Sequence, residues 1–202
     1  MKRLAVLISN AGTGTNLQAI IDAIEAKKLN AEIAVVLSDS SDAYGLVRAD
    51  NHDILAHIFQ KEETLEYLLT TTFPVDYIVL AGWKKIIPDA LIDAFPKKIL
   101  NIHPGLIPET LEGVVKNPDG TDGLWNKGKF TEIAIKNVLD SKATYAGSSI
   151  HFLSKEFDFG SVLARCFEKV LPGDTVTSLY TRLKKKENHM LVEALIKLCS
   201  TT

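Results

Sequence analysis

The sequence predicts an α/β fold in which an open, twisted and mostly parallel sheet carries helices on both faces. The chain begins with an uninterrupted apolar run at residues 4–8, which is typical of a strand buried on both faces of a parallel sheet. Similar runs then alternate with stretches whose apolar residues recur at helical spacing. Strands separated by helices need crossover connections, and these connections favour parallel pairing.

The first half of the chain is expected to hold four strands and three helices. The strands are predicted at residues 4–8, 33–37, 54–59 and 75–80. The apolar face of the first helix is predicted from the helical spacing of Leu17, Ile20, Ile21 and Ile24. Two further helices are predicted at residues 43–51 and 62–69.

The second half begins with a short strand at residues 98–103, which ends at Pro104. Residues 104–128 then lose regular patterning and are rich in turn formers, and a loop of this length in a compact domain is usually functional or disordered. A helix is expected from Phe130 to Val138, a hairpin or mixed pair of strands at residues 148–153 and 162–170, and a long helix at residues 176–198. No repeat or linker divides the chain, so residues 1–202 are predicted to form a single domain.

Composition narrows the classes of function. Of the 202 residues, 46% are hydrophobic and 24% charged, as in globular proteins, and the net charge of −2 excludes a broadly cationic surface for nucleic acid or acidic membranes. Cys166 and Cys199 are the two cysteines, and their spacing supports neither a disulfide framework nor a metal site. No apolar stretch approaches the roughly 18 residues of a membrane span. We therefore expect a cytoplasmic protein that acts on small molecules, with no nucleic-acid or membrane partner.

The first candidate site is the glycine-rich turn at residues 9–18, between the first strand and the first helix. Gly12 and Gly14 allow a sharp turn, and the free N–H groups at a helix start can hold a phosphate. The turn matches neither of the two best-known nucleotide fingerprints. The alternative is an ordinary turn with Thr15 or Asn16 near the helix cap.

The second candidate is the pair Asn101 and His103 at the end of a strand. Residues two apart on a strand project to the same side, and open α/β sheets bind ligands at the carboxyl ends of their strands. An amide donor beside an imidazole can stabilise an oxyanion and move protons near neutral pH. The alternative is a capped strand with a hydrogen-bonded histidine.

The third candidate is Asp158, which lies next to the turn glycine Gly160 and just past a strand that contains His151. A carboxylate in that place can orient or charge a histidine at a neighbouring strand end. Taken singly, Asp158 also fits a turn former and His151 a structural hydrogen-bonding residue.

Together these motifs resemble the folate-dependent formyltransferases, and the match spans most of the chain. The resemblance implies a Rossmann-like formyltransferase fold and transfer of a formyl group from 10-formyltetrahydrofolate, as cosubstrate, to an amine. T-N-L-Q-A-I at residues 15–20 is most similar to the branch that formylates glycinamide ribonucleotide in de novo purine biosynthesis. The length of the chain also favours this branch, because methionyl-tRNA formyltransferases and formyltetrahydrofolate deformylases carry an additional domain.

The resemblance also implies roles for individual residues. Asn101 would donate to the oxyanion, His103 would stabilise that charge and pass protons, and Asp158 would orient His103 and favour its charged form. His151 would support this site, and Glu187 would bind the amine or ribose end of the acceptor. The implied phosphate-binding residues are Ala11, Gly12, Thr13, Gly14, Thr15 and Asn16. The implied folate-binding residues are Trp83, Lys84, Lys85, Ile86, Ile87 and Phe157, and no metal is expected.

By this reading the N-terminal half binds phosphate, and the C-terminal half binds folate and carries catalysis. Residues 109–129 differ from the family pattern, because this region is longer than the loop that the family usually has here and its sequence is different. By the same resemblance, Gly113 would correspond to the glycine of the family's loop, and residues 110–128 would act as a lid. The acceptor therefore stays open, and it could be another small amine such as an amino-sugar nucleotide. Two further alternatives are a deformylase, which hydrolyses the donor without any amine, and a non-catalytic module that binds a metabolite. The oligomeric state is open too, a homodimer included.

Overall fold

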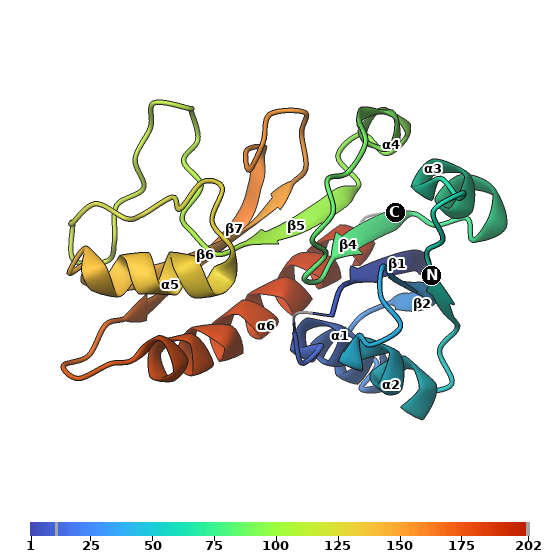
Figure 1. Ribbon diagram of the computed structural model, residues 1–202, viewed down its shortest axis with the longest axis horizontal. Coiled ribbons are helices and arrows are strands. Elements are labelled where there is room, and N and C mark those ends of the chain that lie inside the picture. Colours follow the sequence, from blue (N-terminus) through green and yellow to red (C-terminus); the bar gives the residue numbers. More distant parts are fainter. Residues whose placement is uncertain (11, 201–202) are drawn as a thin grey trace. The chain divides into compact units, whose positions relative to one another are not determined.

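The computed structural model describes residues 1–10 and 12–200 (Figure 1). They group into two compact units. One contains residues 1–101 and the C-terminal residues from Val192, and the other contains residues 102–191. The expectation of one single domain stays a prediction.

The first unit is built on parallel strands. They are β1 (Lys2–Ile8), β2 (Ala31–Ser38), β3 (Ala56–Ile58), β4 (Tyr77–Leu80) and β5 (Ile99–His103), and β5 continues into the second unit at Ile102. Their spatial order is β3-β2-β1-β4-β5, and every one of these pairings is parallel. On β1 the side chains from Leu4 to Leu7 are fully buried, as the apolar run predicts.

Four helices accompany this sheet. Helices α1 (Thr15–Glu25) and α2 (Tyr44–Asn51) lie below the strands of the unit in Figure 1, whereas α3 (Leu65–Tyr67) and α4 (Asp89–Ala94) lie above them. The predicted apolar face of α1 is buried through Leu17, Ile20 and Ile21. Helices on both faces, the arrangement predicted from the sequence, are therefore confirmed for this unit.

Two local predictions in this unit were wrong. Residues 62–69 do not form one regular helix: α3 is a single turn that passes into a π-helix, η1 (Leu68–Thr72). The hydroxyl of Thr70 donates to the carbonyl of Glu66 at 2.7 Å, a contact that competes with the regular helical ladder. Helix α4 was not predicted, because its six residues are too few to show a helical period.

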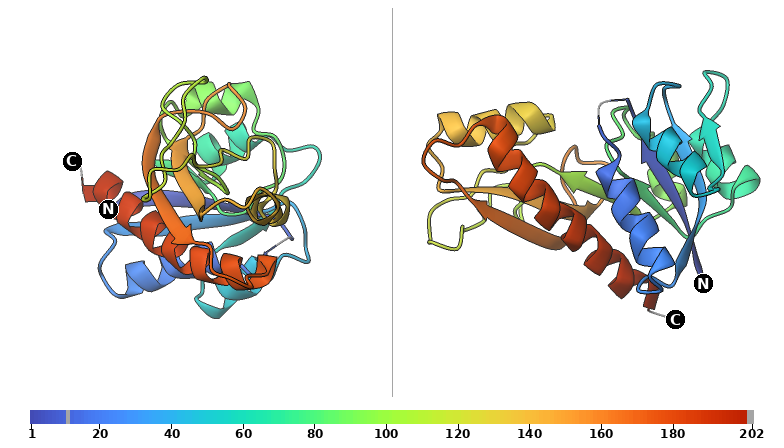
Figure 2. Two further views of the ribbon diagram at one scale, coloured as in Figure 1. Left: turned by 90° about the vertical axis from the view of Figure 1, so that its left-hand side faces the viewer. Right: turned by 90° about the horizontal axis from the view of Figure 1, so that it is seen from below.

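The second unit contains the end of β5, helix α5 (Thr131–Asp140) and strands β6 (Tyr145–Phe152) and β7 (Val162–Lys169), which pair antiparallel. Helix α6 (Val176–Ser200) is one continuous helix, shared between the units (Figure 2). The predicted hairpin and long helix are thus confirmed, and the strand order of the whole sheet is β3-β2-β1-β4-β5-β6-β7. Between β5 and α5, residues 104–130 form the predicted long loop, with one isolated bridge between Lys116 and Asp122.

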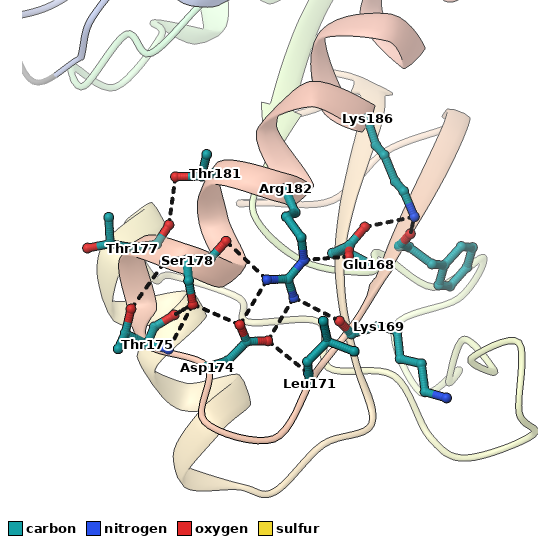
Figure 3. A network of polar contacts seen from close by, with 11 residues as sticks. Glu168, Lys169, Leu171, Asp174, Thr175, Thr177, Ser178, Thr181, Arg182 and Lys186 are labelled. Carbon is teal, nitrogen blue, oxygen red and sulfur yellow. Dashed lines mark hydrogen bonds and ion pairs between the residues drawn. The ribbon is translucent and has the colours of Figure 1, made fainter.

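The start of α6 is held by a polar network around Arg182 (Figure 3). Its guanidinium donates to both carboxylate oxygens of Asp174, at 2.8 and 2.7 Å, and to Glu168 of β7 at 2.9 Å. These bonds hold the pKa of Asp174 well below its usual range, the bond from Arg182 being the largest cause. Thr175 and Ser178 form a reciprocal capping box, each hydroxyl accepting the other's backbone N–H. The network joins the end of β7 to the first turns of the helix that carries Glu187.

Candidate active site

The turn after β1 ends at Gly14, which is the N-cap of α1 and has a left-handed φ of 68°. No side chain among the described residues caps this helix, so its first N–H groups stay available. Thr15 and Asn16 are the first two residues of α1, directly after the Gly14 cap, and the alternative of an ordinary turn with one of them near the cap stays a prediction. Ala11, predicted to bind phosphate, lies outside the described residues.

Asn16, in the first turn of α1, is a buried polar side chain. It is 6% exposed, and its amide oxygen is buried with no hydrogen-bond partner among the described residues. Gly12 and Thr13 are exposed, and Gly14 and Thr15 are partly buried. An unpaired polar atom in a buried place is costly, and in native proteins it usually has a functional explanation.

The predicted folate segment follows β4 in the first unit. The indole ring of Trp83 packs edge-on against Phe59, with ring centroids 6.3 Å apart, and the Lys85 ammonium lies 5.3 Å from the centre of the Phe59 ring. The indole N–H of Trp83 is buried and has no partner within the described part of the chain. Trp83 therefore offers an apolar face together with an unused donor, a combination that suits a flat, polar heterocycle.

The rest of this segment divides between surface and core. The backbone N–H of Lys84 donates to the hydroxyl of Ser9 at 3.1 Å, which ties the segment to the turn after β1. Ile87 is 7% exposed and belongs to the core, whereas Ile86 is 82% exposed. An exposed isoleucine has no packing role in the free chain, so Ile86 is the more available of the two for a ligand.

Three predicted site segments share one edge of the first unit's sheet. The phosphate turn follows β1, the folate segment follows β4, and Asn101 lies in β5, opposite Leu80 of β4. Because β1, β4 and β5 are parallel, their carboxyl ends lie at the same edge. This is where open α/β sheets bind their ligands.

In the second unit, the imidazole of His103 lies between two oxygen atoms. It is 2% exposed, its Nδ1 is 3.6 Å from a carboxylate oxygen of Asp158, and its Nε2 is 2.7 Å from the carbonyl oxygen of Trp125. A carboxylate and a carbonyl are both acceptors, so each ring nitrogen of His103 faces an oxygen atom that can accept a hydrogen bond. The structure thus brings together the predicted pair of His103 and Asp158.

Asp158 is held by the loop that precedes α5. Its second carboxylate oxygen accepts the backbone N–H of Gly128 at 2.7 Å, and its backbone has a left-handed φ of 48°. Burial by itself would raise the pKa of Asp158, but the facing His103 and the Gly128 N–H outweigh it and hold the pKa below its usual value. Asp158 therefore keeps its negative charge beside the imidazole. Its neighbour Phe157, a predicted folate residue, is 59% exposed.

Sequence reasoning missed Trp125 and Gly128. The indole N–H of Trp125 donates to the backbone carbonyl of Asp158 at 3.0 Å, and its own carbonyl accepts from His103. Gly105 makes room for this contact, since a Cβ there would lie 1.8 Å from the carbonyl oxygen of Trp125. A lone tryptophan among polar turn residues was the one available signal, because the bonds themselves use backbone atoms.

His151 supports the same cluster from β6. It is fully buried, its ring centroid lies 6.5 Å from that of His103, and its Nδ1 lies 3.2 Å from the carbonyl oxygen of Phe152. Burial, followed by the neighbouring His103, lowers the pKa of His151 to about 4. A neutral His151 adds no positive charge beside His103.

Lowering the pH is therefore expected to destabilise the fold through His151. In the unfolded chain His151 takes up a proton near its ordinary pKa of about 6.5. In the folded protein the pKa of His151 is about 4, so the proton binds only at lower pH. The unfolded state thus binds more protons in this interval, and the free energy of unfolding falls as the pH drops through it. The loss should reach roughly 3 kcal/mol, which denaturant titrations between pH 7 and pH 4 measure.

The matched control is His189, which lies exposed on α6. A His151→Asn variant should lose this part of the pH dependence, whereas His189→Asn should keep it. The same pH dependence in the unchanged protein and in His151→Asn would contradict the assignment.

Glu187 of α6 is connected to the backbone of His103 through Ser148 of β6. The hydroxyl of Ser148 lies 2.8 Å from the carbonyl oxygen of His103 and 2.9 Å from a carboxylate oxygen of Glu187. Glu187 is 4% exposed, and its other oxygen accepts from the ammonium of Lys184. In this structure the carboxylate of Glu187 is thus engaged by two side chains, an arrangement that favours a role in positioning His103.

Two kinds of feature are absent from the described residues. No group of three or more His, Cys, Asp or Glu side chains there has the arrangement of a metal site. In the same part of the chain, no helix combines the length and the apolar character needed to cross a membrane.

Comparisons with known proteins identify the family of this chain. A family model described as formyl transferase matches residues 2–195. A phosphoribosylglycinamide formyltransferase of Dictyostelium discoideum is 34% identical over 219 residues, covering 98% of both chains. The chloroplastic enzyme of that name from Arabidopsis thaliana is 31% identical over 98% of this chain. The match spans 65% of the length of the Arabidopsis protein. The crystal structure of glycinamide ribonucleotide transformylase 1 from Symbiobacterium toebii matches 98% of this chain with a TM-score of 0.83 and 32% identity, over 88% of its own chain.

Proposed function

Since the chain belongs to the formyl transferase family, we propose that it transfers a formyl group from 10-formyltetrahydrofolate to the amine of glycinamide ribonucleotide in purine biosynthesis. The observation that carries the proposal is the buried His103 beside the half-buried Asp158, with Asn101 two residues before His103 in β5. Two relatives, at 31% and 34% identity, bear the name of this activity.

The reaction needs a nucleophile, a site for an oxyanion and a path for one proton. The acceptor's amine attacks the formyl carbon, a C–N bond forms, and the formyl oxygen becomes an oxyanion. When this intermediate collapses, the bond from carbon to the folate nitrogen breaks, and a proton passes from the attacking nitrogen to the leaving nitrogen. No covalent bond to the protein is required, so positioning and charge stabilisation provide the rate enhancement.

Asn101 and His103 supply the oxyanion site in this proposal. Residues two apart on a strand project to the same side, so the Asn101 amide and the His103 ring are expected to act on one oxygen atom. The Asp158 carboxylate favours the charged form of His103, which stabilises the oxyanion and serves the proton transfer. Because Nε2 of His103 meets the Trp125 carbonyl here, the loop must release that nitrogen before it can act on substrate.

The folate donor is expected to lie against the segment after β4. Trp83 fits such a ligand because its ring is apolar and its buried N–H is unpaired among the described residues. The exposed side chain of Ile86 can cover one face of the pterin, and Lys84 and Lys85 are placed to meet its anionic tail. The donor supplies the activated formyl carbon, while these residues bind and orient it.

The acceptor's phosphate is assigned to the turn after β1. The uncapped N–H groups of α1 and the positive end of its dipole favour an anion there. Glycinamide ribonucleotide carries one phosphomonoester, which fits a site built mainly from backbone groups. Both cysteines are free thiols, which supports a reducing compartment such as the cytoplasm.

A spectrophotometric assay with 10-formyltetrahydrofolate tests the proposal. Loss of the formyl donor should depend on added glycinamide ribonucleotide and should yield the formylated product in equal amount. Loss of the donor without any amine would assign a deformylase instead. Transfer to an amino-sugar nucleotide but not to glycinamide ribonucleotide would assign a different acceptor, and no turnover with any amine would contradict the proposed class of reaction.

A further inference from the structure

Asp158 is held both through its carboxylate and through its backbone. The carboxylate accepts the N–H of Gly128 at 2.7 Å and lies 3.6 Å from Nδ1 of His103. The backbone carbonyl accepts the indole N–H of Trp125 at 3.0 Å, a bond between residues 33 apart in the chain. Trp125 and Gly128 belong to one short segment of the long loop. This segment therefore fixes the backbone and the side chain of Asp158 together.

The backbone of Asp158 needs such support. Its φ of 48° lies in the left-handed region, which is strained for residues other than glycine. A strained conformation of this kind persists only where the surrounding structure holds it. Loss of the bond from Trp125 would let the backbone of Asp158 relax, and a change in that backbone would turn the carboxylate away from His103.

The indole of Trp125 is itself fixed by its neighbours. Its ring packs against Phe159, with ring centroids 5.8 Å apart. The ammonium of Lys127 lies 5.0 Å from the centre of the Trp125 ring and 2.7 Å from a carboxylate oxygen of Glu156. Aromatic and cation–π contacts both favour a defined orientation of the ring. Because Glu156 and Phe159 stand on either side of Asp158 in the chain, the indole is held by the same loop that it supports.

We propose that Trp125 is a positioning residue for the reaction: its indole N–H holds the backbone of Asp158 so that the carboxylate stands beside Nδ1 of His103. This inference rests on the proposed function and adds to it a residue that acts through Asp158. The carbonyl of Trp125, which faces Nε2 of His103, is a different part of the same residue. It can turn away from His103 while the indole keeps its bond to Asp158.

The test compares Trp125→Phe with the control Phe130→Leu in the full chain. Phenylalanine keeps an aromatic ring and the backbone carbonyl at position 125, but it removes the N–H donor. In Trp125→Phe the kcat should fall about 10- to 100-fold, because a displacement of about 1 Å in a reacting group can cost that much. The KM for glycinamide ribonucleotide should stay within about threefold. Phe130 is 65% exposed in the same region, so Phe130→Leu should keep kcat within about twofold.

Two further measurements separate positioning from a general loss of structure. Trp125→Phe combined with Asp158→Asn should have nearly the kcat of Asp158→Asn alone, because the indole acts through the carboxylate. The second measurement is the pKa of Asp158, followed by the carbon NMR resonance that Asp158→Asn removes. Burial raises this pKa, but the bonds from His103 and from the N–H of Gly128 outweigh burial and lower it. A displaced carboxylate loses these bonds, so the pKa of Asp158 should rise toward its ordinary value in Trp125→Phe.

The outcomes separate this inference from the proposed function. An unchanged pKa of Asp158 in a folded Trp125→Phe variant would overturn the inference, whatever the change in kcat. An unchanged kcat would overturn it too, as would losses that multiply fully in the double variant, since Trp125 would then act independently of Asp158. If the unchanged protein formylates no glycinamide ribonucleotide, the proposed function fails, yet a raised pKa of Asp158 in the variant would still support the positioning of its carboxylate by Trp125.

Discussion

Replacing His103 by alanine is expected to lower kcat by about 10²- to 10⁴-fold, because the imidazole both stabilises the oxyanion and moves the proton. These interactions arise mainly in the transition state, so the KM values of the two substrates should change far less than kcat. The measurement is steady-state formyl transfer with each substrate varied in turn.

His103 is buried, so this variant needs a test of folding. Circular dichroism and the Tm should show a folded protein, and His189→Ala, which removes an exposed imidazole from α6, should keep its activity. A kcat within tenfold of the original in a folded His103→Ala variant would remove His103 from the catalytic assignment.

Asp158→Asn should be nearly as harmful, with a fall in kcat of about 10²-fold or more. The substitution keeps the shape of the side chain and still offers an oxygen to the N–H of Gly128. It removes the negative charge 3.6 Å from Nδ1 of His103, and with it the electrostatic stabilisation of positive charge that develops on the ring during the reaction. Steady-state formyl transfer, measured for both proteins under the same conditions, gives the fall in kcat.

The matched control is Asp140→Asn on α5, whose carboxylate is exposed and paired with Lys136. It should change kcat by less than about twofold, since exposed ion pairs contribute little. The double variant His103→Ala with Asp158→Asn should be little worse than His103→Ala alone, because Asp158 acts through the histidine. Fully multiplied losses would contradict that dependence.

Much of the fold follows from the sequence because it depends on local patterns. The buried run of β1 and the helical spacing of α1 each repeat one periodicity over enough residues to be recognised. The short elements did not have that length: α4 has six residues, and η1 follows a single turn of helix. Their geometry depends on competing contacts such as the bond from Thr70 to Glu66.

The chemistry of the site divides in the same way. Asn101, His103 and Asp158 were predicted because side chains suited to acid–base chemistry stood at strand ends and beside a turn glycine. The partners of these side chains were not predicted. The carbonyl of Trp125 and the N–H of Gly128 are backbone groups that every residue except proline offers in full, so no residue type distinguishes them.

The sequence by itself determined the alternation of strands and helices, the glycine-rich turn after the first strand and the residue types available for acyl transfer. Only the tertiary structure decided which groups meet: the Trp125 indole with Asp158, His103 with Asp158 and the Trp125 carbonyl, and Glu187 with Ser148. The physical reason is that hydrophobic periodicity and turn propensity act between near neighbours in the chain. Hydrogen bonds between distant residues depend instead on positions that exist only after the core has packed.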